Sequence, residues 1–300
     1  MAKAIPGVQL ESPLTTYRGP KWAAFSKVVN RELVPRIVLI AVSAFFLFPL
    51  FWMVSVALKS NQELASYPPT LFPRDIQWSN FRNAVETIPF AKYLRNTSVV
   101  TLFTVIGAAI SNPIIAYGFS RIEWPGRDKV FSLVLATVFV PTPVLIVALF
   151  DIYARLGWVN TYLPLIVPFF FGTAFWVFLM RQFFLQIPQE ISDAARIDGA
   201  SELRILFQVI MPQSWPALGA VSLFAAFHAW NDFFGPFIFL TDEPRYTLAL
   251  GLTFFQSQSQ YDVQFNLLMA ASILVVLPVV LIFLSFQRAF VQGVTVSGFK

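Results

Sequence analysis

Long runs of apolar residues, separated by short polar segments, make up most of the chain. Six of these runs approach or exceed the roughly 20 residues that a helix needs to cross the hydrocarbon core of a bilayer. They cover residues 37–58, 97–119, 130–152, 162–180, 217–240 and 265–286. The apolar residues are continuous within each run and do not alternate with polar ones. The pattern therefore predicts an all-α polytopic membrane protein with six transmembrane helices, and not a membrane β-barrel.

The composition supports this fold class and narrows the chemistry. Hydrophobic residues make up 57% of the 300 residues and charged residues 12%, whereas soluble domains carry about 25% charged residues. The chain contains no Cys and only one His, His228, which excludes disulfides, thiolate metal sites and multi-histidine metal sites. We therefore expect no metal and no cofactor in this chain, and no nucleic acid partner.

The distribution of basic residues predicts the orientation. If the N-terminus lies in the cytoplasm, the inner segments hold twice as many Lys and Arg residues as the outer segments. Because basic residues collect on the cytoplasmic side of membrane proteins, both termini are expected there.

The first 36 residues form a tail before the membrane domain of residues 37–300. Within it, apolar residues at positions 22, 25, 28 and 29 recur at helical spacing among Lys and Arg residues. This spacing predicts an amphipathic helix on the inner membrane surface. A disordered tail is the alternative.

The inner loop of residues 185–216 carries the clearest local signals. Pro188 suits the first position of a helix, and Glu190 in the first turn suits the helix dipole. Gly199 fits the end of that helix, and Ser201 fits the N-cap of a second one. Pro212 is expected to end the second helix.

Both predicted loop helices carry apolar stripes. Ile191, Ala194 and Ala195 share one face of the first helix, and the second stripe consists of Leu203, Leu206, Phe207 and Ile210. Such stripes must be buried against something. The partner is either the cytoplasmic ends of this protein or another protein.

At this loop the sequence resembles the membrane subunits of ABC importers. Their signature is Glu-Ala-Ala, three residues, Gly, nine residues and Ile-x-Leu-Pro. Here the same spacing gives Asp193-Ala194-Ala195, Gly199 and Val209-Ile210-Met211-Pro212. Asp193 departs from the usual Glu and has a shorter side chain. The stretches WNDFFGPFIFL and LLMAASILVVLPVVLIFLSFQRAFVQGVTVSGFK are similar to the sugar-type branch, which includes the second membrane subunit of maltose and glycerol-phosphate importers.

The resemblance implies a type I ABC importer permease fold in the inner membrane of a prokaryote. It also implies a second permease, two cytoplasmic ATPase subunits and an extracytoplasmic solute-binding protein as partners. The residues that it places in contact with the ATPase are Glu190, Asp193, Ala194, Ala195, Asp198, Gly199, Ala200, Leu203, Phe207 and Pro212. The chain has no phosphate-binding loop and no evident catalytic group, so ATP and Mg²⁺ are expected only in the partner ATPase.

Polar residues within the predicted spans are candidates for the solute pathway, because ionisable and polar groups in a membrane usually face a cavity or a partner. Residues 111–113 and 141–143 interrupt two spans. His228 and Asp232 lie four residues apart, on one face of a continuous helix. The pathway candidates are Asn112, Thr142, His228, Trp230, Asn231 and Asp232. A purely structural role in helix packing is the alternative for these residues.

A free-standing, ion-coupled secondary transporter is the alternative function. Such carriers show internal repeats and coupling carboxylates near the midplane. The sequence shows no repeat and a single central candidate, Asp232. The importer subunit is therefore favoured.

Overall fold

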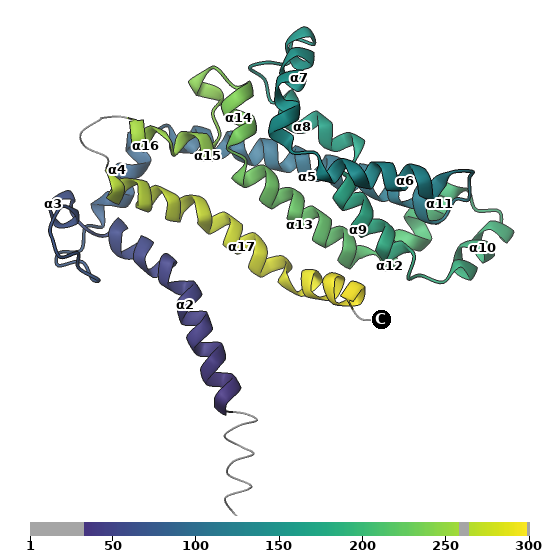
Figure 1. Ribbon diagram of the computed structural model, residues 1–300, viewed down its shortest axis with the longest axis horizontal. Coiled ribbons are helices and arrows are strands. Elements are labelled where there is room, and N and C mark those ends of the chain that lie inside the picture. Colours follow the sequence, from purple (N-terminus) through teal and green to yellow (C-terminus); the bar gives the residue numbers. More distant parts are fainter. Residues whose placement is uncertain (1–32, 258–263, 299–300) are drawn as a thin grey trace, which may run out of the picture. The chain divides into compact units, whose positions relative to one another are not determined.

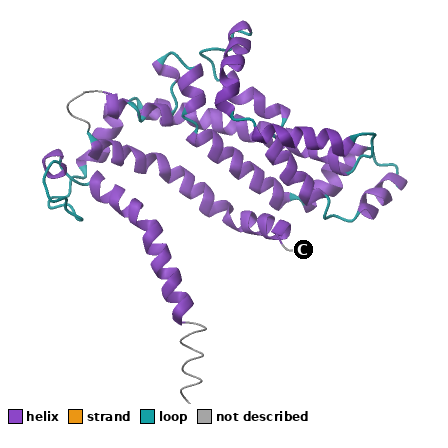
Figure 2. Cartoon of the chain, in the orientation of Figure 1, coloured by secondary structure: helices purple, strands orange, loops and turns teal. Residues whose placement is uncertain are grey.

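The computed structural model describes residues 33–257 and 264–298, which form helices joined by loops and turns (Figures 1 and 2). No strand occurs in these two ranges. The all-α prediction is confirmed for this part of the chain. The amphipathic helix predicted around residues 22–29 lies outside the described residues.

The chain divides into two compact units, Met1–Trp52 and Met53–Lys300. The described part of the first unit is the larger part of α2 (Val34–Ala57), which runs through Pro49 and corresponds to the first predicted span. Its apolar side chains up to Phe51 are exposed, and the rings of Phe45 and Phe46 meet edge to face at 5.7 Å.

The second unit contains the remaining helices and four short 3₁₀ or π segments. In chain order the helices are α3 (Asn61–Leu64), α4 (Ser79–Thr87), α5 (Phe90–Ser120), α6 (Arg127–Ala136), α7 (Thr142–Arg155), α8 (Leu163–Ile166), α9 (Ala174–Phe184), α10 (Gln189–Ile197), α11 (Glu202–Ile205), α12 (Met211–Gln213), α13 (Trp215–Asn231), α14 (Phe234–Phe239), α15 (Leu248–Gly251), α16 (Phe254–Ser257) and α17 (Phe265–Gly298). The 3₁₀ segments are η2 (Thr137–Phe139), η3 (Val167–Phe171) and η5 (Glu243–Arg245), and η4 (Leu206–Ile210) is a π-helical turn.

The core of the second unit lies between α5, α9, α13 and α17. Figure 1 shows α5, α13 and α17 as long neighbouring helices, and α13 packs against both of the others. The largest buried cluster joins the loop-side ends of α5, α9 and α13, and it includes Met180, Phe184 and Val221. α5 runs without a break through Pro113.

Four described helices or helix combinations are long and apolar enough to cross a membrane, and the number rises to six if each of two bent pairs is one span. One bent pair covers the third predicted span. There α6 and η2 meet α7 at an angle of 99°. The break falls at Val140 and Pro141, because a residue that precedes Pro is driven out of the helical conformation. The predicted interruption at residues 141–143 is confirmed.

The fifth predicted span, residues 217–240, is wrong at its second end. α13 ends at Asn231, and Asp232 takes an extended conformation before α14 begins at Phe234. At its first end, α13 meets the helical segment of residues 202–213 at 87°.

The fourth predicted span is irregular, and polar groups of α5 bind its backbone. Its backbone leaves the helix between η3 and α9, where Gly172 has a φ of 85°. Ser111 Oγ donates to the carbonyl oxygen of Phe169 at 2.9 Å, and Asn112 Oδ1 accepts from the backbone N–H of Thr173 at 2.9 Å. These bonds supply partners for backbone groups that a broken membrane helix leaves free.

Candidate functional site

The loop that joins α9 to α13 folds as two helices with a sharp turn, as predicted. α10 starts at Gln189, and Pro188 is its N-cap. Pro188 was predicted at the first helical position, so the helix starts one residue later than predicted. Gly199 follows the helix with a φ of 79°, which residues other than Gly adopt only at a cost. Ser201 is the N-cap of α11, and its Oγ accepts from the backbone N–H of Arg204 at 3.4 Å.

The second half of the loop differs from the prediction. The predicted apolar stripe is split, since Leu206 and Ile210 are buried whereas Leu203 and Phe207 are 61% and 51% exposed. Leu203 and Phe207 lie along one edge of the stripe and Leu206 and Ile210 along the other, so the boundary of the buried surface runs through the stripe. The segment Leu206–Ile210 forms a π-helical turn, η4, which the periodicity did not predict.

The predicted helix end at Pro212 is also wrong. Pro212 lies inside α12, and the chain bends only at Ser214. α12 is therefore the last short piece of the loop before α13.

The interpretation that the stripes pack on this protein's own helices holds for part of the loop. Leu206 and Ile210 join the protein's own buried cluster. Other apolar side chains of α10, α11 and η4 stay exposed, and we call them the exposed apolar set. Its members are Ile191, Ala194, Ile197, Leu203 and Phe207.

The structure places the predicted contact residues of the loop mainly at the surface. The exposed ones are Glu190, Asp193, Ala194, Asp198, Gly199, Leu203, Phe207 and Pro212, and the half-buried ones are Ala195 and Ala200.

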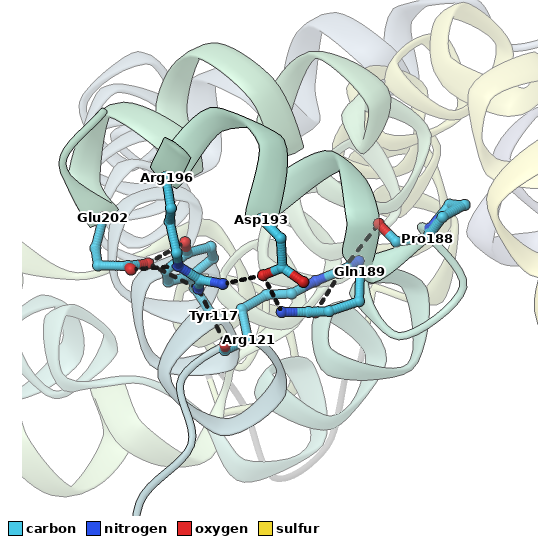
Figure 3. A network of polar contacts seen from close by, with 7 residues as sticks. All are labelled: Tyr117, Arg121, Pro188, Gln189, Asp193, Arg196 and Glu202. Atoms are coloured by element: carbon cyan, nitrogen blue, oxygen red, sulfur yellow. Dashed lines mark hydrogen bonds and ion pairs between the residues drawn. The ribbon is translucent and has the colours of Figure 1, made fainter. Parts of the chain in front are cut away.

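A network of charged groups joins the loop to the end of α5 (Figure 3). The Arg196 Nε donates to Glu202 Oε1 at 2.8 Å, and its Nη1 donates to Asp193 Oδ1 at 2.7 Å. Tyr117 of α5 donates its hydroxyl to Glu202 Oε2. Arg121, which follows α5 directly, donates to Gln189 Oε1 at 2.8 Å and to the Ile187 carbonyl oxygen at 2.6 Å.

The electrostatics of this network favour its charged state. The hydrogen bond from Arg196 lowers the pKa of Glu202, and the same bond raises the pKa of Arg196. Burial lowers the pKa of Arg121, although a guanidinium keeps its charge at any physiological pH.

Arg121 and Tyr117 were not identified from the sequence. One signal existed for Arg121, a basic residue directly after an apolar span. Their partners lie 63 to 85 positions further along the chain, so local spacing could not reveal the contacts.

The candidates for a solute pathway fall into two groups. Thr142, His228 and Asn231 are exposed and Asp232 is half-buried, whereas Asn112 and Trp230 are buried. The Asn112 amide bonds to Ala108 and Thr173, and Trp230 Nε1 donates to the Val275 carbonyl oxygen at 3.0 Å. In this conformation these two side chains serve the packing of the bundle.

His228 and Asp232 do not share a helical face, contrary to the prediction. Asp232 lies beyond the end of α13, and its Oδ1 accepts from the backbone N–H of Gly235 at 3.0 Å. The His228 ring instead contacts two aromatic rings edge to face, Phe169 at 5.3 Å and Trp176 at 6.3 Å. The contact joins α13 to η3 and α9, which the sequence alone does not connect.

Comparison with known proteins identifies the class. The family described as "Binding-protein-dependent transport system inner membrane component" matches residues 104–296, which is more than half of the chain. The chain belongs to this family of membrane transport proteins.

Individual relatives cover nearly the whole chain. The arabinooligosaccharides transport system permease protein AraQ of Bacillus subtilis is 33% identical over 262 residues, covering 86% of this chain and 92% of that protein. The sn-glycerol-3-phosphate transport system permease protein UgpE of Pectobacterium atrosepticum is 32% identical and covers 84% of this chain and 91% of that protein.

A solved structure has the same fold. It belongs to a bacterial ABC transporter involved in the import of the acidic polysaccharide alginate, and it matches with a TM-score of 0.75 over 92% of this chain and 100% of that chain, at 23% identity. The fold of the present chain is therefore that of an ABC importer permease.

Proposed function

We propose that this chain is one permease subunit of an ATP-driven importer for an oligosaccharide, a disaccharide or a sugar-like solute such as glycerol 3-phosphate. Its partners in this proposal are a second permease, two cytoplasmic ATPase subunits and an extracytoplasmic solute-binding protein. The support is that relatives covering most of the chain are named as permease proteins for arabinooligosaccharides, diacetylchitobiose and sn-glycerol 3-phosphate.

The exposed apolar set carries the proposal for the loop. Ile197 is 87% exposed and Leu203 is 61% exposed, on a loop whose charged network holds its two helices in a fixed turn. Apolar side chains presented in this way favour a protein partner. In the proposal, the ATPase binds this loop, residues 185–216, and Asp193, Ala194 and Phe207 belong to the contact.

The proposed topology has six spans in residues 37–300, with both termini in the cytoplasm of a prokaryote and the protein in its inner membrane. Each of the two bent pairs then contributes one spanning segment, and α13 is the spanning part of the second pair. The excess of basic residues in the inner segments supports this orientation.

The subunit itself is proposed to be non-catalytic and to bind no cofactor, with ATP and Mg²⁺ used by the ATPase subunits. Among the described residues, no three His, Asp or Glu side chains are close enough together to hold a metal ion. The sequence has no phosphate-binding loop of the G-x-x-x-x-G-K-[ST] type.

For the solute pathway, we retain the accessible candidates: Thr142, His228, Asn231 and Asp232. His228 lies against the stacked rings of Phe169 and Trp176, whose centroids are 5.7 Å apart. An imidazole and an amide offer hydrogen bonds to sugar hydroxyls, and a neighbouring ring offers a face for the apolar side of the sugar. Asn112 and Trp230 are retained only as packing residues.

The first experiment is affinity purification of the chain from its native membrane in mild detergent, with mass spectrometry of the proteins that accompany it. We expect an ATPase and a second permease. The double variant Leu203→Asp/Phe207→Asp should lose the ATPase and keep the second permease. Ile122→Asp, which changes an exposed apolar residue on the neighbouring α5–α6 loop, is the matched control and should keep both partners.

Solute identity is then tested with the accompanying binding protein. Its affinity is measured for arabinotriose, diacetylchitobiose, trehalose, maltose and sn-glycerol 3-phosphate. If the chain instead purifies alone and transports solute alone in liposomes, it is a secondary transporter and the importer proposal is wrong.

A further inference from the structure

α10 is attached to the rest of the protein by few apolar contacts. Of its nine residues only Ser192 is buried. The preceding helix α9, by comparison, buries Trp176, Val177, Met180 and Phe184. A helix with so little buried surface is oriented mainly by its polar bonds, and for α10 these bonds converge on two arginines.

Arg121 holds the chain where α9 ends and α10 begins. The residue is 3% exposed. Its Nη2 donates to the carbonyl oxygens of Phe184 and Ile187, and its Nη1 donates to Gln189 Oε1 and, at 3.5 Å, to the carbonyl oxygen of Pro188. The side chain thus satisfies carbonyl groups at the C-terminal end of α9, where a cation is also favoured by the helix dipole.

Arg196 completes a closed ring from the other side. Its Nη2 donates to the backbone carbonyl oxygen of Arg121 at 3.3 Å, and its Nε donates to Glu202. Glu202 accepts the hydroxyl of Tyr117, and the backbone N–H of Arg121 donates to the Tyr117 carbonyl oxygen at 2.8 Å. Figure 3 shows these side chains gathered between the end of α5 and the two loop helices.

We infer that Arg121 is a positioning residue that joins α10 to the end of α5, so that displacement of α10 is transmitted into α5. The inference rests on the proposed function, in which a bound ATPase displaces α10. A guanidinium is required because its planar fork reaches several acceptors at fixed angles, whereas the ammonium group of Lys is a point charge on a flexible stem. Arg121→Lys keeps the positive charge and removes this geometry.

The test follows α5 directly in the complete complex. The chain has no Cys, so Ile114→Cys on α5, at a position that is 39% exposed, gives this subunit one labelling site. Cysteines of the partner subunits are replaced, the complex is labelled with bimane, and emission is recorded without nucleotide and after trapping with ATP and vanadate. We expect trapping to shift the emission when Arg121 is present and this shift to be lost in Arg121→Lys.

The control is Arg127→Lys. Arg127 is the first residue of α6, pairs with Asp128 at 3.5 Å and donates to the Ile122 carbonyl oxygen at 3.4 Å. Because these bonds do not reach α10, its variant should shift like the parent. The amounts of co-purified ATPase and of trapped nucleotide are measured in every sample. If Arg121 had only a structural role, Arg121→Lys would reduce the amount of assembled complex, but the complex that did assemble and trap nucleotide would still show the emission shift of α5.

Every outcome of this measurement supports or overturns the inference. A normal emission shift in Arg121→Lys, or no shift in the parent, overturns the inference. If Arg121→Lys fails to assemble, Gln189→Ala, which removes the α10 side chain that accepts from the Arg121 guanidinium, is measured in the same way, and a normal shift there overturns the inference. If the parent chain recovers no ATPase at all, the proposed function itself is wrong.

Discussion

The two ends of α5 are bonded to the rest of the second unit by different kinds of side chain. At the N-terminal end most bonds join neutral groups, and one bond, from the Tyr93 hydroxyl to Glu243 Oε1 at 3.1 Å, reaches a carboxylate. Asn96 Nδ2 donates to the carbonyl oxygens of Pro244 and Tyr246 at 3.0 and 2.9 Å, and Thr97 Oγ1 accepts from the backbone N–H of Leu248 at 2.8 Å. Asn96 and Thr97 are both buried. The N-terminal end of α5 is thus held by buried polar side chains.

At the C-terminal end the bonds come from charged groups, and apolar side chains remain exposed beside them. The ring of Arg121, Arg196, Glu202 and Tyr117 is partly open to solvent, since the Arg196 and Glu202 side chains are 31% and 43% exposed. The difference indicates two tasks. The N-terminal end of α5 fixes a fold, whereas the C-terminal end fixes the orientation of a loop that offers a surface to a partner.

The largest effect is expected from truncating the buried group at each end. Asn96→Ala leaves two carbonyl oxygens without a donor, at a cost of about 1–3 kcal/mol in the free energy of unfolding. Arg121→Ala leaves three carbonyl oxygens and Gln189 without their charged donor, at a cost of roughly 3 kcal/mol or more. Thermal unfolding in detergent, followed by tryptophan fluorescence, measures both. Equal losses would remove the contrast between the two ends.

A smaller effect is expected at the turn between α10 and α11. Gly199 has a φ of 79°, so Gly199→Ala forces an unfavourable backbone conformation and costs about 1–2 kcal/mol. The matched control is Gly118→Ala in α5, where an added methyl group meets no described atom within 4 Å and should be neutral or stabilising by up to about 1 kcal/mol. The same thermal measurement applies, and a neutral Gly199→Ala would show that the turn conformation is not held.

The pH dependence should also differ between the ends. The folded-state pKa of Glu202 is below its ordinary value of 4.5, so its stabilising contribution is complete above that value and is lost as the pH falls through the folded pKa. The pair is partly exposed, so the contribution is less than about 1 kcal/mol. The stability difference between the parent and Glu202→Gln should therefore shrink below pH 4.5, whereas the difference for Asn96→Ala should not change.

The sequence predicts the fold class and the local chemistry of the loop better than its long-range contacts. Gly199 and Ser201 act through their own backbone neighbours, so their roles were predictable. The π-helical turn depends on how Leu206 and Ile210 pack on the bundle, which periodicity does not include. The contacts of His228 with Phe169 and Trp176, and of Arg121 with the loop, join segments more than 50 residues apart, and no local pattern encodes them.

The smallest effect is expected at Asp193, where the family signature has Glu. Its pair with Arg196 measures 2.7 Å, but the two side chains are 54% and 31% exposed, and exposed ion pairs contribute about 0.2–1 kcal/mol. Asp193→Asn should therefore lower the free energy of unfolding by less than about 0.5 kcal/mol. Asp193→Glu keeps the negative charge and should leave the parent value unchanged. Unfolding of both variants in low and high salt measures this difference. A loss as large as that of Arg121→Ala would mean that the exposed ion pair holds the loop to α5 as strongly as the buried guanidinium does, because Arg196 would then depend on Asp193 for its orientation toward Glu202.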